Sequence, residues 1–136
     1  MILIILSCAL LVSTQWACNI VSSEPTQPDQ YALRLISELQ SSESKFHHQY
    51  GRYGSLKEMA KGEVEPLRSN FAGAATGSYH GYVFHLQADA DHYRITAGPE
   101  QWGVSGRRSF YCDESRTVRE SWAREIDANG DSKVLK

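Results

Sequence analysis

The spacing of the apolar residues changes once along this chain, from a helical period to the period of two that strands require. Between residues 32 and 50, apolar side chains recur at the three- and four-residue spacing of one helix face, with polar residues opposite. This stripe predicts an amphipathic helix of about five turns. We expect Asp29, which follows Pro28, to be its N-cap, and Gly51 to end it. The stripe consists of Ala32, Leu35, Ile36, Leu39, Phe46 and Tyr50.

A short second helix is predicted after Gly54. Ser55 and Glu58 have the spacing of a capping box, in which each side chain accepts a hydrogen bond from the other residue's backbone amide. Gly62 closes this segment, and residues 63–81 are rich in glycine, serine and other small residues without a period. We therefore expect an irregular surface loop before the first strand.

Strands are predicted where the apolar period becomes two. Residues 82–86 and 93–97 alternate around a polar turn at 88–91, which is typical of an antiparallel hairpin. A second alternating pair follows, with Phe110 and Cys112 on one face of its first strand. Its second strand carries Val118, Glu120 and Trp122. The predicted fold class is α+β: a long N-terminal helix packed on an antiparallel sheet of about four strands.

The N-terminal segment is apolar and carries no charge before Glu24. Its densest run, from Ile2 to Val12, has the length of a signal-peptide core, roughly 7–15 residues. Residues 1–17 are therefore a predicted signal peptide, with three open fates. Cleavage near Ala17 would release a soluble domain, and lipid attachment would make Cys18 the first mature residue. An uncleaved anchor is the third, since the uncharged stretch reaches the ~20 residues that span a bilayer.

The remaining chain has room for one domain. We expect residues 18–30 to form a polar linker and residues 31–136 a single domain with a polar C-terminal tail. The formal net charge of -2 gives neither the basic footprint of a nucleic-acid-binding protein nor an acidic tail. The predicted partners are therefore proteins of the cell envelope and the membrane itself, not nucleic acids.

The cysteines leave two alternatives open. If Cys18 carries lipid, Cys112 is a lone strand cysteine and behaves as a small buried hydrophobic residue. If Cys18 is free in an oxidising compartment, a Cys18–Cys112 disulfide could attach the N-terminus to the sheet.

Five segments of the chain form a familiar series: residues 33–37, 50–56, 81–84, 93–97 and 106–115. On these segments, the chain from Ala32 to Trp122 resembles the globular heads of type IV pilin-like proteins and type II secretion pseudopilins. The resemblance implies a shared fold and, for function, contact with protein partners rather than catalysis. The N-terminus departs from the family, because no basic leader, Gly-Phe-type processing site or long assembly helix with a glutamate near its start is found in it.

One partial metal pattern lies near the C-terminus. Asp127, Asn129 and Asp131 have the spacing of the first oxygen ligands in a calcium loop. Ser132 replaces the usual glycine, and no glutamate follows before Lys136. A polar turn is therefore the interpretation we favour, with calcium binding as the minority alternative, and no cofactor is predicted.

The histidines give no metal spacing. His47 and His48 are adjacent on a helix and diverge by ~100°, and the odd separation of His80 and His85 places them on opposite sides of a strand. We predict that these histidines are solvated.

No nucleophile motif or specialised acid–base pair is readable. No serine lies in a Gly-x-Ser-x-Gly elbow, and Asp89 and Asp91 lie in a predicted solvated turn. Arg107 and Arg108 near Trp102 could bind an anionic or aromatic ligand, but we favour a solvated loop that holds one tryptophan against the sheet.

The function predicted from these features is that of a non-enzymatic exported envelope protein that acts by protein–protein contact, as an accessory to a pilus or type II secretion system. The alternative is a free periplasmic or extracellular ligand-binding module. An exposed apolar groove along Tyr82, Tyr93 and Trp102 would favour ligand binding, whereas a flat uncovered helix face would favour assembly.

Overall fold

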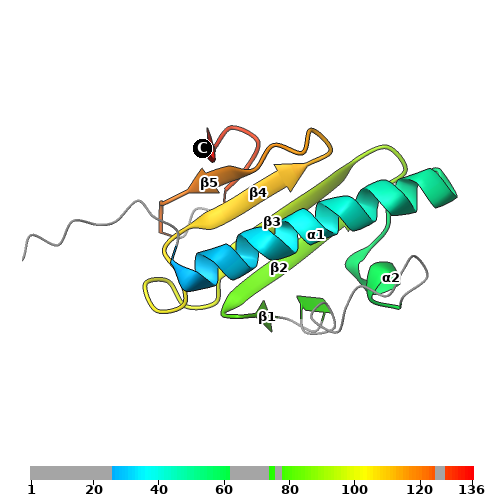
Figure 1. The fold of residues 1–136 in the computed structure, drawn as a ribbon. Coiled ribbons are helices and arrows are strands. Elements are labelled where there is room, and N and C mark those ends of the chain that lie inside the picture. The colour runs from blue at the N-terminus through cyan, green and yellow to red at the C-terminus, as the bar shows by residue number, and fades with distance from the viewer. Residues whose placement is uncertain (1–25, 62–73, 76–77, 125–127) are drawn as a thin grey trace, which may run out of the picture.

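The computed structural model describes residues 26–61, 74–75, 78–124 and 128–136. The sheet is antiparallel throughout and follows chain order, β1-β2-β3-β4-β5-β6, and the long helix lies along one of its faces (Figure 1). No helix among these residues is long and apolar enough to cross a bilayer. The elements are α1 Gln27–Tyr50, α2 Leu56–Ala60, β1 Ser78–Tyr79, β2 Tyr82–Ala88, β3 Tyr93–Pro99, β4 Ser109–Asp113, β5 Arg119–Ser121 and β6 Lys133–Val134.

The predicted α+β class, the long helix and both hairpins are confirmed, but the sheet has six strands rather than about four. The two extra strands, β1 and β6, form its edges and contain two residues each. Strand β1 falls inside the segment predicted as an irregular loop, and β6 falls inside the predicted C-terminal tail. Alternation cannot be recognised in two residues, which is why the sequence pattern missed both edges.

The start of α1 differs from the prediction. Its N-cap is Thr26, not Asp29. The Asp29 amide donates to Thr26 Oγ1 (3.5 Å), and the Thr26 amide donates to Asp29 Oδ2 (3.0 Å), which makes a capping box. Pro28 is tolerated inside the first turn, where its missing N–H needs no partner. The helix therefore begins within the predicted 18–30 linker.

The predicted end of α1 and the predicted start of α2 are confirmed. The C-cap of α2 is Lys61, and Gly62, which was expected to close this helix, lies outside the described residues. Gly51 caps α1 with a positive φ of 67°, and its amide donates to the His47 carbonyl (2.8 Å). Before α2, the Ser55 amide donates to Glu58 Oε2 (2.8 Å) and the Glu58 amide to Ser55 Oγ (3.3 Å). These caps fix where the chain turns back from the helix toward the sheet.

The core lies between α1 and the helix-facing side of the strands. Most of the predicted stripe is buried, but Tyr50 is 44% exposed. Gln40 and Glu43 are buried on the same helix face, between the apolar residues. The core residues from the helix and the long strands are Ala32, Leu35, Ile36, Leu39, Tyr82, Phe84, Tyr93, Ile95, Ala97, Phe110 and Cys112.

Gly106 is needed where the loop after β3 passes Tyr82. A Cβ at Gly106 would lie 2.8 Å from Tyr82 Cζ, and the ring has no room to retreat because Tyr82 is fully buried. We expect Gly106→Ala to lower the free energy of unfolding by about 1–3 kcal/mol, the usual range for overpacking. Urea denaturation measures the change.

Gly130→Ala is the matched control for this substitution. Its nearest neighbour, the Tyr111 hydroxyl, would lie at 3.8 Å, an ordinary contact distance. We expect an effect within about 0.5 kcal/mol for this control. Equal losses for the two variants would show that the contact with Tyr82 is not what excludes a side chain at residue 106.

Candidate functional site: the open face of the sheet

The sheet face opposite α1 carries polar side chains from three adjacent strands. The strand register sets them in cross-strand rows, because His85 is opposite Thr96 and Thr96 is opposite Tyr111. A second row runs from Gln87 through Arg94 to Asp113. We call these six residues the open face. Each is exposed or half-buried.

Two adjoining depressions lie on this face, of about 400 and 380 Å³. They share Gln87, Arg94 and Tyr111. The first is bordered by Ala128 and Asn129 of the C-terminal segment. The second extends to the turn between β2 and β3 and to the end of β4, and its rim includes Asp89, His92, Asp113 and Glu114.

Hydrogen bonds hold the side chains of the open face in place. Arg94 Nη2 donates to Gln87 Oε1 (2.6 Å), and the Tyr111 hydroxyl donates to Asp113 Oδ2 (3.2 Å). Each bond joins two side chains that border the same depression. The face therefore presents a polar surface of defined geometry, with Arg94 supplying positive charge at its centre.

The rim of the second depression is acidic and contains one titrating imidazole. His92 Nδ1 lies 2.8 Å from Glu114 Oε1, and this hydrogen bond raises the pKa of His92 above its usual 6.5. The backbone amides of His92 and Asp91 donate to Asp89 and lower the pKa of its carboxyl group. The Asp89 carboxylate is consequently ionised at neutral pH and accepts hydrogen bonds rather than supplying a proton.

The predicted solvation of the histidines is confirmed, since His47, His48, His80 and His85 are all exposed. Two of them contact tyrosine rings: His80 stacks on Tyr31, and the His47 ring is tilted against the Tyr53 ring. Within the described ranges, no three His, Cys, Asp or Glu side chains are grouped so that they could hold a metal ion.

Of the partial calcium pattern, Asp127 lies outside the described residues. Asn129 uses its side-chain oxygen in a local turn, where it accepts from the Asp131 amide (2.9 Å). The Ser132 hydroxyl accepts from the Asn129 amide (3.0 Å) and closes the same turn. These contacts form a polar turn, in which Asn129 also borders the first depression.

Cys112 is fully buried in β4 and forms no disulfide within the part of the chain that the structure describes. The Gln40 side-chain amide contacts its Sγ atom. Burial raises the pKa of the thiol to about 11, which makes Cys112 a poor nucleophile at neutral pH. Cys18 lies outside the described residues, so its lipidation and the Cys18–Cys112 pairing stay predictions.

The interpretation of Arg107 and Arg108 as parts of one solvated loop is wrong for Arg108. Arg107 is exposed, but Arg108 is only 2% exposed. Its guanidinium lies 4.1 Å above the ring of Trp122, rather than beside Trp102. The physical reason is that Arg108 has two buried carboxylate partners, which repay the cost of removing its charge from water.

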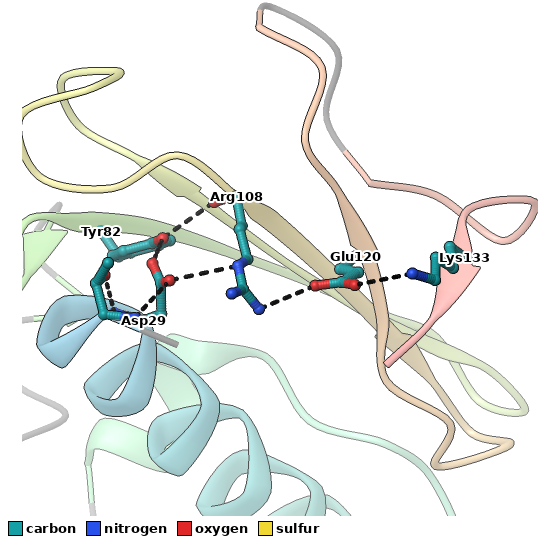
Figure 2. Close-up of polar contacts among 6 residues, drawn as sticks. Asp29, Tyr82, Arg108, Glu120 and Lys133 are labelled. Atoms are coloured by element: carbon teal, nitrogen blue, oxygen red, sulfur yellow. Dashed lines mark hydrogen bonds and ion pairs between the residues drawn. The ribbon is translucent and has the colours of Figure 1, made fainter. Parts of the chain in front are cut away.

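Those partners form a buried ion-pair network that joins α1 to the sheet (Figure 2). Arg108 Nη1 lies 3.2 Å from Glu120 Oε2, and Arg108 Nε lies 3.6 Å from Asp29 Oδ2. The Tyr82 hydroxyl donates to Asp29 Oδ1 (2.6 Å), and burial raises its pKa so that the proton is retained. Lys133 of β6 approaches Glu120 from the surface at 4.0 Å. We call Asp29, Tyr82, Arg108 and Glu120 the buried network.

No protein-family model, curated protein or solved structure matches this chain. The fold, the open face and the sequence of the N-terminal segment are therefore the basis for a proposed function. The buried network is not a candidate binding site, because all four of its side chains are buried and form ion pairs or hydrogen bonds within the domain.

The groove that would have favoured apolar ligand binding is not formed by its proposed tyrosines. Tyr82 is fully buried and Tyr93 is 4% exposed, so both belong to the core. The outer face of α1 carries polar residues instead, including the exposed ion pair of Arg34 with Glu38 (3.3 Å). The open face and the outer face of α1 therefore offer mainly polar side chains for recognition.

Proposed function

We propose that this chain is a non-enzymatic, exported protein of the cell envelope whose pilin-like head acts by protein–protein contact. The observation that carries the proposal is the open face. On β2, β3 and β4, polar side chains occupy one face of the sheet, and α1 covers the other face (Figure 1). The apolar residues 2–12 support export. A long helix packed on an antiparallel sheet is the arrangement expected of a pilin or pseudopilin head.

The chemistry of the open face suits a protein partner. Arginine and tyrosine are enriched at protein interfaces, and Arg94 and Tyr111 lie on adjacent strands there. Both side chains are already held by hydrogen bonds, which reduces the entropy lost when a partner binds. Positive charge at Arg94 beside an acidic rim favours a partner with complementary charges, which gives specificity more than affinity.

The proposed location is the outer side of a membrane, with the domain held there through lipid on Cys18 or through the uncleaved N-terminal segment. Intact mass of membrane and soluble fractions from a bacterial host tests this. A membrane species that carries lipid at Cys18, or one that retains Met1, is the expected result. A soluble, unmodified product beginning near Cys18 would instead favour the free ligand-binding module.

Contact through the open face is tested by site-specific photo-crosslinking in cells. A benzoylphenylalanine residue at Thr96, in the middle of the open face, should give a discrete adduct with an envelope protein, of which a pilus or type II secretion component is the proposed kind. The same residue at Ser37, exposed on the outer side of α1, is the control and should give none.

The two positions separate the alternatives. An adduct at Ser37 but not at Thr96 would move the contact to the helix and contradict the proposed surface. No protein adduct at either position would favour the ligand-binding alternative, for which the depressions of about 400 and 380 Å³ lie within the ~300–1,000 Å³ of small-molecule sites.

A further inference from the structure

One end of the domain, where α1 begins, exposes large apolar side chains. Val104, in the loop between β3 and β4, is 80% exposed, and Trp122, just after β5, is 39% exposed. Tyr31 and Tyr79 are half-buried at the same end. We call these four residues the apolar end.

Contacts among the described residues bring the apolar end together around the first turns of α1. Tyr31 stacks on His80 with ring centroids 4.1 Å apart, and His80 meets Tyr79 edge-on at 4.3 Å. The loop that carries Val104 is attached nearby, since the Glu100 amide donates to the Gly81 carbonyl (2.8 Å).

Trp122 belongs to the same end through the buried network. Its ring lies 4.1 Å from the Arg108 guanidinium, and Arg108 pairs with Asp29 of the first helical turn. Strand β5 ends at Ser121, immediately before this tryptophan. Figure 1 places the start of α1, the β3–β4 loop and the end of β5 at one end of the molecule.

The two ends of the domain differ in charge. Arg107 and Arg124 are exposed near the apolar end, accompanied there by Glu100. The opposite end, at the β2–β3 turn and the end of β4, is acidic and holds one imidazole. Its exposed or half-buried charged side chains include four acids, Asp89, Asp91, Asp113 and Glu114, together with His92 and Arg116.

If the N-terminus is held in a membrane, the length of chain before α1 limits the distance between the bilayer and the start of α1. Gln27 is nine residue steps from Cys18, and at ~3.3–3.6 Å per step they span at most about 32 Å. With 24 residues at 1.5 Å rise, α1 is itself about 36 Å long. The tether is shorter than the helix, so the end where α1 begins is the end kept close to the bilayer.

We propose that the apolar end rests on the lipid bilayer, with Val104 and Trp122 at the boundary between headgroups and acyl chains. This inference rests on the proposed function, because it requires an exported chain held at a membrane. Tryptophan and tyrosine favour that boundary, where the ring is in an apolar layer and its polar atom is hydrated. Arg107 and Arg124 would meet anionic headgroups, and the acidic end would point away from them.

The test uses the full chain reconstituted in vesicles of phosphatidylethanolamine and phosphatidylglycerol. A benzoylphenylalanine residue replaces Val104 in one variant and Ala90, exposed in the β2–β3 turn at the acidic end, in the matched control. After irradiation, intact mass spectrometry measures the fraction of protein that has gained one phospholipid. We expect this fraction to be several-fold higher for position 104 than for position 90.

Flotation of the same vesicles distinguishes a failure of the proposed membrane tethering from a failure of this inference alone. Protein that does not float with lipid overturns the proposed tethering and this inference with it. Protein that floats but gives no lipid adduct at position 104, or equal adducts at positions 104 and 90, overturns the inference alone and leaves the exported, tethered protein in place.

Discussion

Replacing Arg108 with methionine should lower the free energy of unfolding by about 3–5 kcal/mol, because the substitution leaves two buried carboxylates without their cation. Asp29 is 1% exposed and Glu120 is 7% exposed, so water cannot replace the guanidinium. The same change removes the contact with the Trp122 ring at 4.1 Å. Urea denaturation followed by circular dichroism measures the loss, with the midpoint falling at constant slope.

The neighbouring Arg107→Met is the matched control, since Arg107 is exposed and its loss should change stability by no more than about 0.5 kcal/mol. Adding Glu120→Gln to Arg108→Met should recover part of the loss, because it removes one of the unpaired carboxylates. A loss below about 1 kcal/mol for Arg108→Met would mean that water reaches the carboxylates. The buried network would then not hold α1 on the sheet.

The domain should lose stability as the pH rises from about 4.5 to 7, because of Glu43. This carboxyl group is fully buried in α1. Oε2 accepts from the Gly54 amide (3.0 Å), whereas Oε1 has no hydrogen-bond partner among the described residues. Burial raises its pKa from 4.5 to about 7, against the opposing effect of the Gly54 hydrogen bond.

The sign follows from proton binding. Between pH 4.5 and 7 the folded state keeps the Glu43 proton that the unfolded chain releases, so unfolding becomes easier as the pH rises. At about 1.36 kcal/mol per pKa unit, the rise from 4.5 to about 7 corresponds to about 3 kcal/mol lost above the folded pKa. Denaturation midpoints measured across this range report the fall directly.

Glu43→Gln should flatten this part of the stability profile, since glutamine does not titrate. His92→Gln is the control. The His92 imidazole also contributes less stability as the pH rises, because the hydrogen bond to Glu114 raises the pKa of His92. The His92→Gln variant should leave most of the fall in place. Glu58 titrates outside this window, since hydrogen bonds from Arg52 and Ser55 lower its pKa to about 2. If stability falls by the same amount in Glu43→Gln, a group other than Glu43 causes the loss.

The parts of this fold that follow from local sequence could be predicted. The apolar stripe of α1, Gly51 and the Ser55–Glu58 capping box each act within a few residues, so their spacing alone indicates them. The two hairpins likewise follow from alternation. The start of α1 was placed three residues late because Asp29 follows a proline and resembles an N-cap, whereas Thr26 occupies that position.

Long-range partners could not be predicted in the same way. Asp29 and Arg108 meet only because the sheet places the start of β4 beside the start of α1, and no local pattern encodes that pairing. One signal was available, since Glu120 shares a strand face with Val118. A buried acid on an apolar face has to be paired with a cation or kept protonated. Gln40 and Glu43 on the stripe of α1 were similar signals.

The open face was partly readable from the sequence. The alternation that buries Phe84 and Ile95 puts His85 and Thr96 on the opposite side, as the register confirms. The depressions themselves depend on where the C-terminal segment lies, and that segment has no period. Asn129 reaches the face because the Ala128 amide donates to Ser109 Oγ (2.7 Å) across the sheet.

The strand order also determines the sequence in which the domain can assemble. Each strand among the described residues pairs with its neighbours in chain order, so a chain delivered N-terminus first can add each strand to its predecessor as it emerges. The apolar face of α1 stays exposed until β2, β3 and β4 have been delivered and can cover it. The bond from Arg108 to Glu120 also needs β5, so the buried network is complete only when the chain through residue 120 is in place.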